Sequence, residues 1–423
     1  MEIIHLKNKE NLPALSGESL MSTRVSGEFR FDIKDTLRNM GTRSICYNKN
    51  NILVSHLYSN RVHKINLLTG KISWFDHHNR TVRHILACNN EIITASWDGS
   101  VGVTDFDTLN IRLRLTELSM GRCPHVEISS DSGEIYSYTY DSDKDPERFS
   151  NTIRTWSLQD GALKNTTLLN GYHLGSRRAG SCIFLKNHLY SVSNSGNFEI
   201  IDCTTNSIQK IFCHEDLGSV LATGAPGNET IVFGGSSGTI YKYNIRDNSL
   251  TSLKGHDYTI QSLALCREQN LLISIDSGGV LNIWKLPEFE LLSSTSVFHN
   301  YLWTVSIAND LVLTGGEEGV IWIYDIKEPD KITLKGKLVV FEEAYSLIPE
   351  DSGEFFSTDP SKIRVIRKEN NTTENSRHSD YLLISQNNFR VVHDMFKIKP
   401  ENQLSTSGID KLMLQLPEKS KIK

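Results

Sequence analysis

The chain contains eight copies of one pattern, in which an apolar run, a tight polar turn and an alternating apolar run follow one another. Copies such as "EIITASWDGSVGVTD" (91–105) and "LVLTGGEEGVIWIYD" (311–325) align on the last residue of the turn. The steps between these anchors are 39, 52, 45, 42, 41, 40 and 42 residues, and the anchors are Asn60, Gly99, Asn151, Gly196, Gly238, Gly279, Gly319 and Ser361. A fixed period of this length indicates a repeat architecture in which each copy is one structural unit.

Each copy predicts two β-strands joined by a hairpin. Five of the eight anchors are Gly and two are Asn, the residues that tolerate positive φ in tight turns. The alternation in "VLNIW" (280–284) has the period of a strand, and no long stretch has a helical period. Because the spacing matches that of propeller blades, we predict an all-β propeller with eight blades, or with seven as the alternative.

Histidines recur in phase with the repeat. His78, His256 and His299 are each followed four residues later by an apolar residue that opens the next strand. The segment "GHDYTI…LLIS…GGVLNIW" (255–284) is similar to the Gly-His … strand … Trp repeat of the WD40-repeat β-propeller family, and the similarity covers about residues 27–367.

The resemblance implies a propeller of the WD40 type. It also implies a structural network within one blade, in which His256 bonds Ser274 and Ser274 bonds the side chain of Trp284. Gly278 stands where the family has its turn aspartate, and Asp276 lies two residues earlier. The fourth member of the network therefore stays open.

The segment "GEFRFDI" (27–33) predicts a strand ahead of the first unit. We expect it to complete the last blade, so that the N-terminal strand closes the ring and leaves no open edge. The expected organisation is an N-terminal extension (1–26), the propeller (27–368) and a C-terminal extension (369–423). That extension contains a polar loop, a candidate hairpin (381–396) and a short helix (408–419).

The composition fits a globular protein, with 38% hydrophobic and 22% charged residues. The formal net charge of −5 gives no reason to expect nucleic acid, and no apolar window has the length of a membrane span or signal peptide. Cys46, Cys88, Cys182 and Cys266 lie in apolar runs without a CxxC pair, so we expect buried free thiols. We predict a cytoplasmic protein, with the nucleus also compatible, and no cofactor, metal or membrane partner; the oligomeric state stays open.

Ser274, His256 and Asp276 are the residue types of a hydrolase triad. A catalytic set should occur once, whereas these histidines recur with the repeat. We therefore interpret the three residues as structural and predict no catalytic residue.

Asp141, Asp143 and Asp145 in the enlarged third unit begin with the spacing of a calcium loop. Pro146 and Thr152 stand where that loop has Gly and Glu. A solvated hairpin insertion, which could also contact a partner, is the preferred interpretation.

Several loops between the strands carry arginines and large aromatic residues, which dominate interface hot spots. In WD40 proteins, the connections between blades and the turns between second and third strands share one face, where partners commonly bind. Adjacent arginines could receive an acidic or phosphorylated segment, whereas Trp303 could also be part of the core. The predicted partner-binding residues are Arg83, Trp97, Tyr172, Arg177, Arg178, Tyr301 and Trp303.

We predict a non-enzymatic scaffold or adaptor that binds proteins or peptides through these loops. One alternative is a substrate receptor of a ubiquitin ligase, which would carry an F-box or a Trp-Asp-x-Arg tail. No stretch near the N-terminus resembles an F-box, and "YNIR" (243–246) keeps only the final arginine. The other alternative is an enzyme with carboxylates and histidines converging on the propeller channel.

Overall fold

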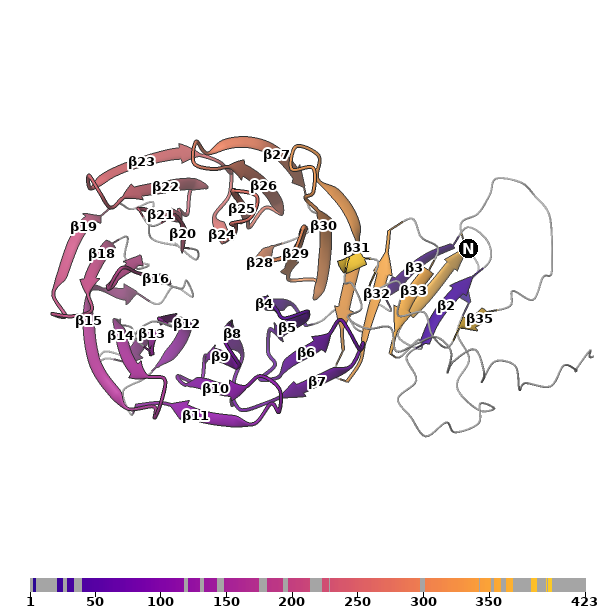
Figure 1. The fold of residues 1–423 in the computed structure, drawn as a ribbon, viewed down its shortest axis with the longest axis horizontal. Helices are drawn as coiled ribbons and strands as arrows, with labels where there is room; N and C mark the ends of the chain where they lie inside the picture. Colours follow the sequence, from indigo (N-terminus) through magenta and orange to yellow (C-terminus); the bar gives the residue numbers. More distant parts are fainter. Residues whose placement is uncertain are drawn as a thin grey trace, which may run out of the picture.

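The protein is a ring of antiparallel β-sheets that stand around a central channel, with a smaller group of strands at one side (Figure 1). The computed structural model describes residues 3–4, 21–25, 29–33, 40–117, 121–129, 133–142, 148–174, 181–192, 197–213, 223–227, 229–296, 301–341, 343–350, 354–358, 363–367, 382–385, 393 and 395–397. Each blade contains four consecutive strands in the order of the sequence, and the first strand lies innermost.

The strands of blades 1 to 3 are β4 (Thr42–Asn48), β5 (Asn51–His56), β6 (Val62–Asn66) and β7 (Ile72–Phe75), then β8 (Val82–Cys88), β9 (Glu91–Ser96), β10 (Val101–Asp105) and β11 (Ile111–Leu115), then β12 (Arg122–Ser129), β13 (Glu134–Ser142), β14 (Arg148–Ser157) and β15 (Leu163–Leu174). Those of blades 4 and 5 are β16 (Ser181–Leu185), β17 (His188–Val192), β18 (Asn197–Asp202) and β19 (Ile208–Cys213), then β20 (Thr223–Gly227), β21 (Thr230–Gly234), β22 (Thr239–Asn244) and β23 (Ser249–Lys254). Those of blades 6 and 7 are β24 (Ile260–Cys266), β25 (Leu271–Asp276), β26 (Val280–Lys285) and β27 (Glu290–Ser296), then β28 (Leu302–Ala308), β29 (Leu311–Gly316), β30 (Val320–Asp325) and β31 (Thr333–Val340).

The prediction of eight blades is wrong, and the seven-blade alternative is correct. The eighth repeat unit does not form a blade, because its two strands enter different sheets. Its first strand, β33 (Glu354–Ser357), pairs with β32 (Tyr345–Pro349) and with β2 (Met21–Val25). Its second, β34 (Ile363–Arg367), pairs with β1 (Ile3–Ile4) and β3 (Phe29–Ile33).

The ring closes without a strand from the N-terminus, contrary to the prediction. All four strands of blade 7 come from residues 302–340, and β3, which lies in the predicted closing segment, belongs to the separate sheet with β34. The sheet of blade 7 continues outward from β31 through β32, β33 and β2 to β35 (Leu382–Ser385). These strands form the group beside the ring in Figure 1.

Apolar side chains hold neighbouring blades together at every seam of the ring. Seven buried clusters lie one at each of the seven seams, as expected for sheets whose two faces are both covered. The cluster between blades 7 and 1 includes Leu313 and Ile323 from blade 7 together with Ile52 and Ile65 from blade 1. Burial of both faces explains why strands such as β5 and β25 are buried along their whole length.

Side chains near the start of the inner strands also bond the neighbouring inner strand. The Ile45 amide donates to Thr304 Oγ1 (3.2 Å) between blades 1 and 7. His84 Nδ1 lies 3.0 Å from the Val126 carbonyl, and His125 Nε2 lies 2.8 Å from the Cys182 carbonyl. These bonds fix the height of one blade against the next around the channel.

Two parts of the chain that follow blade 7 bond blade 1 across the closing seam. Tyr345 of β32 donates from Oη to the Gly70 carbonyl (3.1 Å). In a short C-terminal segment, His393 Nε2 lies 3.1 Å from the Leu68 carbonyl. Phe396 is 1% exposed within the apolar cluster of this seam, and Lys397 pairs with Asp310 of blade 7 (3.0 Å). We call residues 393–397 the clamp, of which the structure describes 393 and 395–397.

The hairpin turns follow the predicted glycine pattern where the structure describes them. Gly99, Gly238, Gly279 and Gly319 all have positive φ between the second and third strands of their blades. Asn151, aligned as a turn residue, instead lies inside β14, because the third blade extends this hairpin. The predicted C-terminal hairpin contains β35, which pairs with β2, and the helical residues His393, Met395 and Phe396; the predicted helix at 408–419 lies outside the described residues.

The described cysteines are free thiols. Cys182 and Cys266 are buried, whereas Cys46 and Cys88 are partly buried. Burial raises the pKa of the Cys46 thiol to about 12. Among the described residues, no helix has the length and apolar character needed to cross a membrane.

Candidate functional site

The histidine network of blade 6 is enclosed within the blade. His256 Nε2 lies 2.6 Å from Ser274 Oγ, and Trp284 donates from Nε1 to the same oxygen (2.8 Å). His256 Nδ1 lies 3.2 Å from Asp276 Oδ2. The other carboxylate oxygen of Asp276 accepts the amides of Gly278 and Val280 (2.9 and 2.8 Å), so Asp276 fills the fourth place that the sequence left open.

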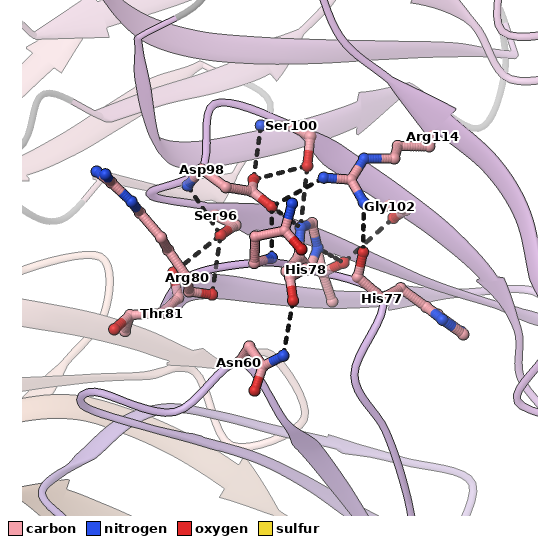
Figure 2. A network of polar contacts seen from close by, with 12 residues as sticks. Asn60, His77, His78, Arg80, Thr81, Ser96, Asp98, Ser100, Gly102 and Arg114 are labelled. Carbon is pink, nitrogen blue, oxygen red and sulfur yellow. Dashed lines mark hydrogen bonds and ion pairs between the residues drawn. The ribbon is translucent and has the colours of Figure 1, made fainter.

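Blade 2 contains a related network, which Figure 2 shows. His78 Nε2 lies 2.7 Å from Thr94 Oγ1, and His78 Nδ1 lies 3.0 Å from Ser100 Oγ and 3.3 Å from Asp98 Oδ2. Arg114 donates to the same Asp98 oxygen (3.1 Å). Burial raises the pKa of Asp98, but the hydrogen bonds from His78 and Ser100 outweigh it and hold the pKa below its usual value. The network fixes the turn that carries Trp97.

Recurrence and burial both argue for a structural role of these side chains. His256 is 4% exposed, and Ser274 and Asp276 have no exposed area, so a substrate cannot reach them without opening the blade. The same kinds of contact in blade 2 show that the arrangement belongs to the repeat.

Replacing His256 with alanine is expected to lower the free energy of unfolding by about 1–3 kcal/mol, because Asp276 and Ser274 lose a buried hydrogen-bond partner. Chemical denaturation measures the loss, and hydrogen exchange should place it in β25 and β26. The exposed control Asp257→Ala should leave the free energy of unfolding nearly unchanged. An unchanged value for His256→Ala would contradict the structural role.

The turns between second and third strands and the connections between blades lie on one face of the ring, which we call the upper face. Two predicted residues, Arg83 and Trp97, meet there, together with Arg122, which was not predicted. The Arg83 guanidinium lies over the Trp97 ring, 4.8 Å from its centroid, and Arg122 lies 5.2 Å from the same centroid. Burial lowers the pKa of Arg83 to about 9, and the positive charge of Arg122 acts in the same direction.

Trp303 lies at the start of β28, two blades away from Trp97 around the ring. Trp303 is half-buried. It forms a second tryptophan–arginine contact, in which the Arg43 guanidinium lies 5.3 Å from the centroid of the Trp303 ring. The ring of Trp303 also packs on Gly41, where a Cβ atom would collide with it. Trp303 therefore packs partly into the fold, and its predicted role in partner binding stays a prediction.

Three tyrosines extend from the upper face into solvent. Tyr58 is 83% exposed in the turn of blade 1, Tyr258 is 58% exposed before blade 6, and Tyr301 is 55% exposed before blade 7. Of the predicted residues, Tyr301 is thus exposed, and Tyr172 lies on β15. Arg177 and Arg178 lie outside the described residues, as do residues 143–147 of the predicted 140–150 insertion, with Asp143 and Asp145.

Sequence reasoning missed Arg43, Arg122, Tyr58 and Tyr258. A signal for Arg43 was present, because "TRSI" and "VRHI" place Arg43 and Arg83 at the same position of consecutive inner strands. The described residues contain no cluster of histidine, cysteine and carboxylate side chains that could hold a metal ion.

A cavity of about 460 Å³ lies on the opposite face, between blades 2 and 3. Its charged groups are already paired: Arg112 bonds Glu91 and donates to the Leu158 and Gln159 carbonyls (2.7 and 3.0 Å). Lys164 pairs with Glu134 at 2.8 Å. The cavity thus offers a ligand few free polar groups.

Comparison with known proteins supports the propeller. No family model matches the chain. A segment is 29% identical over 146 residues to Topless-related protein 3 of Arabidopsis thaliana, which covers 34% of this chain and only 13% of that protein. The fold is similar to the crystal structure of the computationally designed Ika8 protein, with a TM-score of 0.54 and 16% identity over 82% of this chain and 98% of that one.

The seven-bladed ring, the in-phase histidine networks and the similarity to the Topless-related protein point to the same family. The chain is a seven-bladed β-propeller whose repeats resemble those of the WD40 family.

Proposed function

We propose that this propeller is a non-enzymatic interaction platform that binds a partner protein through its upper face. The observation that carries the proposal is the Arg83–Trp97–Arg122 cluster, in which two guanidinium groups lie over one indole ring. Tryptophan, tyrosine and arginine are the residues that contribute most to binding energy at interfaces.

The surroundings of the cluster support the proposal. The turn of Trp97 is held by its own amide, which donates to the Thr81 carbonyl (3.0 Å), and by the Asp98 network. A rigid aromatic anchor loses little conformational entropy on binding. The exposed tyrosines Tyr58 and Tyr301 add apolar area to the same face.

The ligase receptor and the channel enzyme gain no specific support. Arg246, the arginine of "YNIR", follows β22 and pairs with Glu229 at 2.7 Å, so its ion pair lies within blade 5. Ser274, His256 and Asp276 are enclosed within blade 6 and do not converge on the channel.

The paired substitution Tyr58→Ser and Tyr301→Ser tests the platform. Affinity purification with cross-linking should lose the partner, because truncation of each hot-spot side chain costs on the order of 2 kcal/mol of binding free energy. The melting temperature should not change, since both side chains are exposed. The matched control is Leu168→Ser with Leu291→Ser, which removes exposed apolar side chains from the outer strands. Loss of the partner from the leucine control alone would place the interface on the outer strands and refute the proposed face.

A further inference from the structure

Charge is divided unequally over the upper face. Arginines gather on the side of blades 1 to 3, whereas carboxylates gather on the side of blades 6 and 7. The basic side contains Arg43, Arg61, Arg80, Arg83 and Arg122, with Asp76 and Glu117 as its exposed carboxylates. The acidic side contains Asp257, Glu317 and Glu318, with Lys254 of blade 5 beside it.

Within the described residues, none of these five arginines has the ion-pair partner that other arginines of the chain have. Arg112 and Arg246 each pair with a glutamate, and Arg114 pairs with Asp98. Within the part of the chain that the structure describes, no carboxylate forms an ion pair with Arg43, Arg83 or Arg122. We call these three residues the arginine arc.

Two members of the arc, Arg43 and Arg83, are partly buried as well as unpaired, whereas Arg122 is exposed. The Nε atoms of Arg43 and Arg83 are buried and have no hydrogen-bond partner in the described structure. Burying a charged group is costly unless it is paired and hydrogen-bonded. The Trp97 and Trp303 rings lie against these groups, and the attraction of a guanidinium to a ring face offsets only part of that cost.

We propose that the arginine arc binds an acidic, extended segment of the partner protein, whose carboxylates supply the missing counter-charges. The inference rests on the proposed interaction platform and names the chemistry of its ligand. A guanidinium offers two parallel N–H groups to one carboxylate, which is the geometry of the strongest side-chain ion pairs. Neighbouring aromatic residues of the segment can pack on Tyr58 or Tyr301.

A protein segment fits this face better than a nucleic acid does. A continuous polyanion would run into Glu317 of the adjoining blade 7 and Asp257 ahead of blade 6, and into Asp76 and Glu117 beside the arc. The formal net charge of −5 also opposes long-range attraction of a polyanion. A short acidic segment followed by neutral or basic residues satisfies both sides of the face.

The test measures binding of a fluorescent Glu-rich peptide and of its Gln-for-Glu counterpart to the full chain. We expect the Glu-rich peptide to bind, with an affinity that falls as salt rises, and the Gln peptide to bind much more weakly. Arg122→Glu should weaken binding about tenfold or more, because it removes one charge-assisted contact and adds a repulsive charge. Arg122 is exposed, so this variant should fold normally.

The matched control is Lys254→Glu, which makes the same change of charge on the same face beside blade 5. It should change the affinity by no more than about twofold, since screened surface charges interact weakly. Equal weakening by Arg122→Glu and Lys254→Glu, equal binding of the two peptides, or tighter binding of a single-stranded oligonucleotide than of the Glu-rich peptide would each overturn the inference.

The two proposals fail separately. If the Glu-rich peptide does not bind but the tyrosine pair still abolishes partner capture, the acidic ligand is wrong and the platform stands. If the tyrosine pair leaves capture intact, the proposed face is wrong whatever the peptide does.

Discussion

Phe396→Ala is expected to lower the free energy of unfolding by about 3–5 kcal/mol, the usual cost of removing a buried phenylalanine ring. Phe396 is 1% exposed and packs into the cluster that joins blades 7 and 1. The clamp contacts both blades, through the Leu68 carbonyl on one side and Asp310 on the other. Its loss should therefore weaken one seam of the ring selectively.

The selectivity matters because, in the part of the chain that the structure describes, no strand of one blade enters the sheet of the other across this seam. Each blade is built from four consecutive strands. The ends of the ring are therefore held together by side-chain packing and by hydrogen bonds such as those of Ile45 with Thr304 and of Tyr345 with the Gly70 carbonyl. In the variant, hydrogen exchange should increase first in β4 and β28 and later in β16 and β20, which lie across the ring.

The neighbouring substitution Lys397→Ala is the control. It removes the exposed ion pair with Asp310 but leaves the Phe396 ring in place, so it should cost no more than about 1 kcal/mol. If Phe396→Ala destabilised the chain no more than Lys397→Ala, or if exchange rose equally in all blades, the clamp would not be what closes the ring.

The repeat made most of the ring predictable. The strand pairs, the positive-φ glycines such as Gly279 and the network of His256, Ser274 and Trp284 depend on contacts within one unit, and local spacing encodes them. The number of blades depends on closure, which is a contact between units far apart in the sequence. Residues 354–367 have the spacing of a blade, but β33 continues the sheet of blade 7 outward and β34 joins another sheet.

The candidate site shows the same limit. Arg83 and Trp97 belong to one blade, and the sequence placed both near one rim; the structure brings them into contact. Arg122 belongs to the next blade, and Arg43 meets Trp303 across the closing seam. Such contacts depend on how blades pack side by side, which a single repeat does not encode.

Acid is expected to destabilise the ring strongly below about pH 6.5, the ordinary pKa of histidine. Burial lowers the pKa of His125 to about 4 and that of His56 to about 3. Burial also holds the pKa of His84 well below the usual value, and His125, whose ring stacks on it with centroids 4.2 Å apart, acts in the same direction. These histidines stay neutral in the folded ring while they become charged in the unfolded chain.

The sign follows from the number of protons bound. Between the ordinary pKa of histidine and the lowered values, the unfolded chain binds more protons, so the free energy of unfolding falls as pH falls. Glu127 acts in the opposite direction, because burial raises its pKa to about 7. As pH falls, the folded chain binds a proton at Glu127 before the unfolded chain does, which stabilises the folded state. Three histidines against one carboxyl leave a net difference of about two protons, so the free energy of unfolding falls by at most about 3 kcal/mol per pH unit between about pH 4.5 and 6.5.

The double variant His84→Gln and His125→Gln isolates the stacked pair. Glutamine can still donate to the Val126 and Cys182 carbonyls but does not titrate, so stability near pH 7.5 should stay close to that of the wild type. Urea denaturation at a series of pH values should then show a free energy of unfolding that depends much less on pH.

Glu127→Gln should make the free energy of unfolding depend more steeply on pH instead, since it removes the opposing proton. If the double variant kept the wild-type slope, protonation of these two histidines would not be the cause of the acid sensitivity. Because both rings bond the next inner strand, their protonation would act first on the seams from blade 2 to blade 4, beside the arginine arc.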